Sequence, residues 1–98
     1  MAANQNVEKN KTISRYSIYI PDSVKKSLAK ISLPWSLHLK QTIDRLEYEP
    51  FLGEKMKGEM KKNRKIKVWP HRIIYQIDQQ RKLIKILEVE RRGNISYD

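Results

Sequence analysis

Short runs of alternating apolar and polar residues predict four strands along the chain. In residues 15–20, Tyr16, Ile18 and Ile20 alternate with the other side chains, which is typical of a strand with one buried face. Further runs that favour strands occupy residues 65–68, 72–78 and 82–90. The last of these is the most apolar, so we expect it to lie inside the sheet rather than at an edge.

Two amphipathic helices are predicted between the first strand and the second. Pro21 ends the strand, and Asp22 or Ser23 can cap a helix that runs to Lys30. Residues 32–34 break this helix before a second one that reaches about residue 48. The apolar stripe of the second helix consists of Trp35, Leu39, Ile43 and Leu46, and we interpret it as core.

The order β-α-α-β-β-β predicts an α+β fold with an antiparallel sheet. The last three strands are close enough in the chain to pair as a meander. A two-helix hairpin would cover one face of the sheet and leave the other open. Residues 1–12 are polar and without periodicity, so we expect a disordered arm, followed by a single domain at residues 13–98.

The net charge of +10 changes the picture, because its distribution is uneven. Residues 54–72 contain eight basic and two acidic residues. Such a field attracts the phosphates of nucleic acids, although a solvated lysine-rich surface is the alternative. The chain has no cysteine, which excludes disulfides and thiolate chemistry. Without a long apolar run or a secretory signal, we expect a cytoplasmic protein with no membrane partner.

A cluster of cations is predicted on the open face of the sheet. If Ile66 and Val68 face the helices, alternation places Lys65 and Lys67 together in solvent. Arg72 begins the next strand after a tight turn and should lie beside them. An RNA backbone would stabilise charges gathered in this way.

The C-terminal half resembles the RelE/ParE toxin superfamily of type II toxin–antitoxin systems. The motifs are KMKG at 55–58, KIKVWPHRIIYQID at 65–78 and KLIKILEVERRGNISY at 82–97, and the likeness covers about residues 15–97. It implies a RelE-like fold and an endoribonuclease that cuts messenger RNA in the ribosomal A site, inhibiting translation. The nucleophile would be the substrate's own 2′-hydroxyl, so no cofactor or metal is expected.

The resemblance also implies the site residues, which we predict to be Lys65, Lys67, Arg72, Arg92 and Tyr97. Lys67 would be the base, since neighbouring cations lower the pKa of a lysine, and Lys65 would stabilise the phosphate. Arg72 and Arg92 would clamp it, while Tyr97 would orient the 2′-hydroxyl or stack on a base. Arg91 remains an alternative to Arg92. The residues predicted to bind RNA or the ribosome are Lys55, Lys57, Lys61, Lys62, Arg64 and Arg91.

Other polar and aromatic residues receive plainer interpretations. His71 is a rival acid or base, but its position next to Arg72 favours the opposite face and a packing role. Trp69 is expected to cover an edge of the core rather than to stack on a base, Tyr75 to lie in the core and His38 on the surface. With two distant histidines, no cysteine and no carboxylate cluster, no metal site is predicted.

The expected partners are a RelB-type antitoxin, the ribosome and messenger RNA. Three alternatives stay open. A ParE-like toxin would poison DNA gyrase and cut no RNA. A non-catalytic module would only bind nucleic acid, and a degenerate toxin would only bind its antitoxin.

Overall fold

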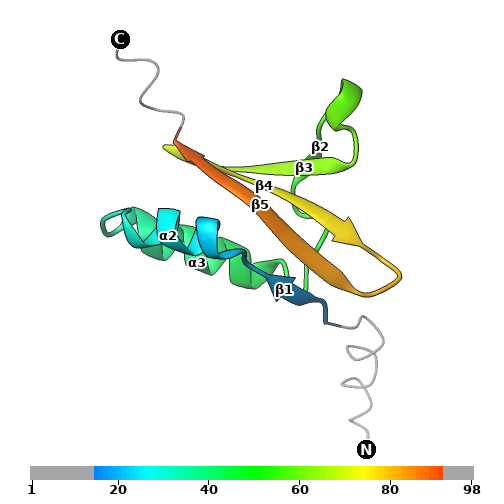
Figure 1. The fold of residues 1–98 in the computed structure, drawn as a ribbon, viewed down its shortest axis with the longest axis horizontal. Coiled ribbons are helices and arrows are strands. Elements are labelled where there is room, and N and C mark those ends of the chain that lie inside the picture. The colour runs from blue at the N-terminus through cyan, green and yellow to red at the C-terminus, as the bar shows by residue number, and fades with distance from the viewer. Residues whose placement is uncertain (1–14, 92–98) are drawn as a thin grey trace, which may run out of the picture.

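The computed structural model describes residues 15–91, which form one sheet with two helices on one side (Figure 1). The predicted α+β class and all four predicted strands are confirmed. The predicted arm at residues 1–12 and two predicted site residues, Arg92 and Tyr97, lie outside the described residues. The helices and strands are β1 (Ser17–Tyr19), α2 (Asp22–Ala29), α3 (Trp35–Arg45), β2 (Glu54–Lys55), the 3-10 helix η1 (Gly58–Met60), β3 (Asn63–Val68), β4 (His71–Asp78) and β5 (Leu83–Arg91).

The described strands lie in the order β1-β5-β4-β3-β2. Strands β3, β4 and β5 pair antiparallel as the predicted meander, and β5 lies inside the sheet as expected. Strand β1 instead pairs parallel with β5, so the predicted antiparallel sheet is mostly antiparallel, with this edge strand as the exception. The two helices lead from β1 at one edge of the sheet to β2 at the other edge, and the meander then brings β5 back beside β1.

The helices begin and end somewhat differently from the prediction. Helix α2 begins after Pro21, and no side chain caps it, so the predicted cap by Asp22 or Ser23 is wrong. Asp22 lies in the first turn, where a carboxylate interacts favourably with the helix dipole. Helix α3 ends at Arg45, earlier than predicted.

The core lies between the helices and the adjoining face of the sheet. Leu39, Ile43 and Leu46 are buried as predicted, whereas Trp35 is only partly buried. From the sheet, the buried side chains are Ile73, Tyr75, Ile84 and Ile86. The predicted core position of Tyr75 is confirmed: it is fully buried, its hydroxyl donates to the Pro50 carbonyl at 2.8 Å, and it accepts from the Gly53 amide at 2.9 Å. These bonds join the segment before β2 to the middle of the sheet.

A β-bulge in β5 reverses which side chains face the helices. Ile74 pairs with Glu88, but its neighbour Tyr75 pairs with Ile86, so Leu87 has no place in the register. Since paired residues share a face, Ile84 and Ile86 face the core while Glu88 and Glu90 face away from it. Without the extra residue, strict alternation would put all four on one face.

Candidate functional site

Three predicted cations gather on the sheet face that turns away from the helices. Lys67 pairs directly with Arg72, and Lys65 pairs with Ile74, the next position on the same face of β4. Same-face neighbours on a strand lie about 7 Å apart, and paired residues have Cβ atoms about 5 Å apart. The predicted convergence of these three residues is therefore confirmed.

Carboxylates from β5 complete this cluster. Arg72 pairs with Glu90 in the register, and its Nε and Nη2 both donate to Glu90 Oε1, at 3.0 and 2.6 Å. Glu88 lies one position further along the same face, opposite Ile74. The face thus has one row of Lys67, Arg72 and Glu90, and beside it a row of Lys65, Ile74 and Glu88.

The two glutamates interact with each other. Hydrogen bonding to Glu90 raises the pKa of the Glu88 carboxyl above its ordinary value. Partial burial and the negative charge of Glu90 raise it further, and the charge of Arg72 opposes them. Glu88 therefore holds a proton more readily than a lone surface glutamate does.

Ile74 separates the polar groups of the second row. It is 4% exposed although it turns away from the helices, and it lies outside the main core cluster. It is therefore a buried apolar residue between Lys65 and Glu88 in the register.

Arg91 does not belong to this cluster. It pairs with His71, which places it on the helix-bearing face, opposite to Arg72. The structure therefore does not bring Arg91 together with Lys65, Lys67 and Arg72. Arg92 remains a prediction that the described residues do not test.

Trp69 in the β3–β4 connection and His71 at the start of β4 behave differently. His71 is buried on the helix side, and its Nδ1 has no hydrogen-bond partner within the described residues. Desolvation lowers its pKa, and the charge of Arg91 lowers it further, which agrees with the predicted packing role. Trp69 is 70% exposed, so the expectation that it covers a core edge is wrong. His38 is exposed as predicted.

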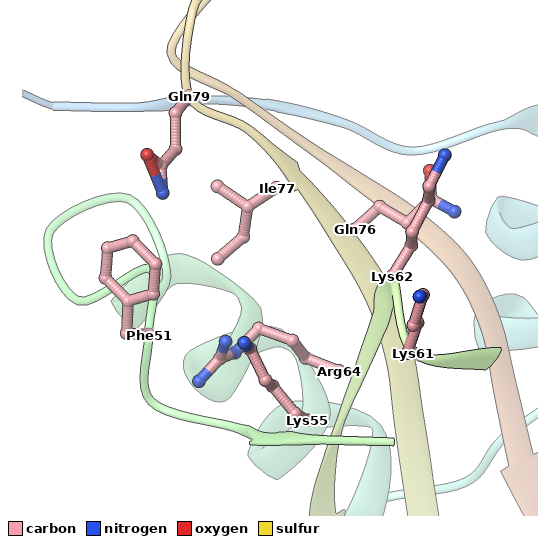
Figure 2. A pocket seen from close by; sticks show the side chains of 8 residues that line it. All are labelled: Phe51, Lys55, Lys61, Lys62, Arg64, Gln76, Ile77 and Gln79. Carbon is pink, nitrogen blue, oxygen red and sulfur yellow. The ribbon is translucent and has the colours of Figure 1, made fainter. Parts of the chain in front are cut away.

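Four further predicted cations line a separate hollow of about 540 Å³: Lys55, Lys61, Lys62 and Arg64. Lys55 pairs with Arg64, and Arg64 with the buried Tyr75, so both project from the face opposite to Lys65 and Lys67. Figure 2 shows Phe51 on one side of the hollow, Lys61 and Lys62 on the other, and the Arg64 and Lys55 head groups between them. The Arg64 guanidinium stacks 5.3 Å from the Phe51 ring centre and donates to the Gly53 carbonyl.

This hollow contains uncompensated positive charge. In the described part of the chain, Lys55, Lys61, Lys62 and Arg64 take part in no ion pair, and Lys57 is exposed nearby. Gln76 and Gln79 add amide groups to the lining. Cations, amides and an exposed aromatic ring are the groups that bind single-stranded nucleic acid.

The sequence interpretation missed Glu88, Glu90 and Phe51. Glu88 and Glu90 are two residues apart, so alternation places them on one face of the strand. The same alternation, however, predicts that Ile84 and Ile86 share this face, which would put the glutamates on the core side. Phe51 follows a proline in a segment without periodicity, so only its nearness to several lysines hinted at a role.

Residues 15–91 hold no group of three or more His, Cys, Asp or Glu side chains arranged to bind a metal ion. Neither helix in that range is long and apolar enough to cross a membrane.

Comparison with known proteins places this site in context. Residues 18–95 match the family model of the ParE toxin of the type II toxin–antitoxin system, parDE. A search of curated proteins found no significant match.

Several solved structures share the fold. The toxin–antitoxin complex RelBE2 from Mycobacterium tuberculosis has a TM-score of 0.72 at 20% identity, covering 82% of this chain and 94% of that one. The archaeal RelE–RelB complex from Pyrococcus horikoshii gives 0.67 at 26% identity, with 81% and 97% covered. The isolated RelE toxin from E. coli gives 0.68 at 20% identity, with 78% and 83% covered.

Proposed function

Because this chain belongs to the ParE toxin family of type II toxin–antitoxin systems, within the RelE/ParE superfamily, we propose that it is a RelE-type endoribonuclease. It would cleave messenger RNA in the ribosomal A site and inhibit translation. The observation that supports this most is the direct pairing of Lys67 with Arg72, with Lys65 beside them on an open sheet face. A gathering of cations on a solvent-facing surface has its clearest use in holding a phosphodiester.

The reaction requires positive charge at the point where negative charge develops. When the 2′-hydroxyl attacks the phosphorus, the phosphorane gains charge that preorganised cations stabilise. Arg72 would bind two phosphate oxygens through its planar fork, and Lys65 and Lys67 would neutralise the charge. Arg92 and Tyr97 are proposed to complete the site as clamp and orienting group. No metal or cofactor enters this scheme, because the nucleophile comes from the substrate.

Contacts outside the reacting nucleotide would hold the RNA. Trp69, exposed beside Lys67 at the strand end, offers a ring for a base. We assign the hollow around Phe51 to ribosomal or messenger RNA, with Lys55, Lys57, Lys61, Lys62 and Arg64 as its cations and Arg91 as a further contact. Because Lys55 and Arg64 project from the face opposite to the cation cluster, these two groups of cations would touch different parts of the ribosome.

A cognate antitoxin of the RelB type would control the activity in the cytoplasm. The solved structures that share this fold include complexes of RelE with RelB. An amphipathic, partly acidic segment would suit the apolar helix faces and the positive charge of this chain.

Purified protein, programmed ribosomes and end-labelled message test the proposal. We expect a cut inside the codon in the A site, leaving a 2′,3′-cyclic phosphate and a 5′-hydroxyl, and no cut when that nucleotide carries a 2′-deoxy sugar. The reaction should proceed with chelator present and should not occur on naked message. An intact message on programmed ribosomes would contradict the proposal.

A second candidate follows from the family description itself, which names ParE. A ParE-like toxin would poison DNA gyrase and leave messages intact. Gyrase supercoiling assays with relaxed plasmid would then show inhibition, whereas the RelE-type proposal expects unchanged supercoiling. Binding to mixed RNA without cleavage or gyrase inhibition would instead favour a non-catalytic module.

A further inference from the structure

The open face contains acidic groups where the cluster would otherwise be purely cationic. Glu90 shares an oxygen with two N–H groups of Arg72, and Glu88 interacts with Glu90 one position away. Like-charged carboxyls placed together destabilise a fold unless they share a proton or serve a function. Both glutamates reach this face only because of the bulge at Leu87, a feature that re-aims side chains next to active sites.

We propose that the Glu88–Glu90 carboxyl pair, rather than Lys67, accepts the proton of the attacking 2′-hydroxyl. This inference rests on the RNA cleavage proposed above. It assigns the general base to β5, and it leaves Lys65, Lys67 and Arg72 as cations while the nucleophile approaches.

The geometry places the pair beside the phosphate that Arg72 would bind. Glu90 accepts from the Nε and Nη2 atoms of Arg72, which uses only part of the hydrogen-bonding capacity of the guanidinium. The other N–H groups can bind phosphate oxygens. A nucleotide held on Arg72 and Lys67 would therefore have its ribose next to the carboxyls, within hydrogen-bond reach of a base.

Protonation states also favour a carboxyl over an amine. An ordinary lysine, with a pKa of about 10.4, is almost wholly protonated at neutral pH and must lose that proton before it can act as a base. A carboxylate is ready to accept one, and a raised pKa makes it the stronger base. The charged groups that face the pair are Lys65 and Lys67 from β3, Arg72 from β4, Lys85 on β5 itself and Glu54 from β2.

The proposed step balances in protons and bonds. The 2′-hydroxyl proton passes to a carboxylate oxygen of the pair as the O2′–P bond forms. The P–O5′ bond then breaks, and the leaving O5′ takes a proton from the Lys67 ammonium. Solvent removes the proton from the carboxyl pair and returns one to Lys67, which restores the starting state.

The test measures single-turnover cleavage on programmed ribosomes as a function of pH. For the wild type, the rate should fall on acidification with the apparent pKa of the pair, not of either residue alone. Glu88→Gln and Glu90→Gln should each abolish this acid limb and slow cleavage by about 10²-fold or more, as loss of a general base does. Glutamine at 90 retains an oxygen that can accept from Arg72, so the arginine stays in place.

Three matched variants control for charge and position. Glu59→Gln removes an exposed carboxylate from η1, and Glu54→Gln removes one beside Lys65; both should retain the acid limb. Glu88→Asp should retain the acid limb of the pH profile at a lower cleavage rate, because the carboxyl is preserved on a shorter side chain. Unfolding midpoints of all variants identify any that fail to fold. If Glu90→Gln fails to fold, the pH dependence of cleavage by Glu88→Gln decides.

The outcomes separate this inference from the proposed function. If the wild type cuts no message, the proposed function fails and the inference with it. If the wild type cuts and both glutamine variants retain its rate and acid limb, only the carboxyl base is overturned. Loss of the limb in Glu54→Gln but not in Glu88→Gln would likewise refute the pair.

Discussion

Arg72 donates Nε and Nη2 to the same oxygen of Glu90, at 3.0 and 2.6 Å, across two strands of the open sheet face. This pair holds the guanidinium plane in one orientation beside Lys67. An arginine with a fixed plane loses less conformational freedom when it binds a phosphate. The relationship therefore joins the acidic and basic halves of the proposed site.

Replacing Arg72 should stop cleavage without unfolding the protein. Arg72→Ala removes the fork and should lower the rate on programmed ribosomes by about 10²–10³-fold, as loss of one preorganised donor does. Arg72→Lys should retain only part of the wild-type cleavage rate. The pair is partly exposed, so the unfolding midpoint should change little. Arg45→Ala, which breaks the exposed pair with Glu49, is the control; an Arg72→Ala protein with full activity would refute the assignment.

The hollow beside Phe51 should contribute to the salt dependence of RNA binding. Lys61→Ala with Lys62→Ala should reduce the slope of log affinity against log salt by about 0.7 for each phosphate that is no longer neutralised. Fluorescence anisotropy with labelled single-stranded RNA measures this slope. Replacement of Lys25 and Lys26 on α2 removes the same charge and should leave it unchanged. Equal slopes for the two double variants would argue against this binding site.

Tyr75 should stabilise the fold through its hydroxyl. Tyr75→Phe leaves the Pro50 carbonyl and the Gly53 amide without their buried partner, at a cost of about 1–3 kcal/mol in the free energy of unfolding. Urea denaturation measures this difference. Tyr19→Phe, at a tyrosine 54% exposed, should cost much less, and equal effects would contradict the role given to these hydrogen bonds.

Gly53 should tolerate no side chain. A Cβ there would lie 2.6 Å from the Lys65 carbonyl oxygen, 2.8 Å from Ile66 Cγ1 and 2.9 Å from Tyr75 Cε1. Gly53→Ala should therefore destabilise by about 1–3 kcal/mol, the usual cost of overpacking. Gly58→Ala meets no atom within 4 Å but must adopt a φ of +67°, at about 1–2 kcal/mol. Thermal and urea unfolding should show the larger loss for Gly53→Ala, together with reduced cleavage because β3 shifts.

His71 should make the fold less stable in acid. Its pKa is lowered from 6.5 by burial and by Arg91, so the unfolded chain binds the proton more readily than the folded one. Stability is therefore complete above the unfolded value and falls as pH drops below about 6.5 towards the lower folded value. Urea unfolding of wild type and His71→Leu at several pH values tests this. The variant should lose this part of the pH dependence, and an unchanged profile would exclude His71 as its source.

Much of the fold could be predicted because its strands alternate and its helices are amphipathic. Ile66 and Val68 favour the buried face of the sheet, so alternation places Lys65 and Lys67 together on the solvent-facing side. The short turn that follows then brings Arg72 beside them. The parallel pairing of β1 could not be predicted, because it depends on where the helices return the chain. The short strand β2 lacks a period and forms through its register with β3.

The sequence by itself determined the α+β class, the meander and the three converging cations, because each follows from a local period and a short connection. Only the tertiary structure decided that Glu88 and Glu90 join Arg72, that Arg91 faces the helices and that Lys55 and Arg64 lie on the opposite face. The physical reason is the register between strands. One extra residue at Leu87 turns the rest of β5 over, and no alternation within a single strand records such a shift.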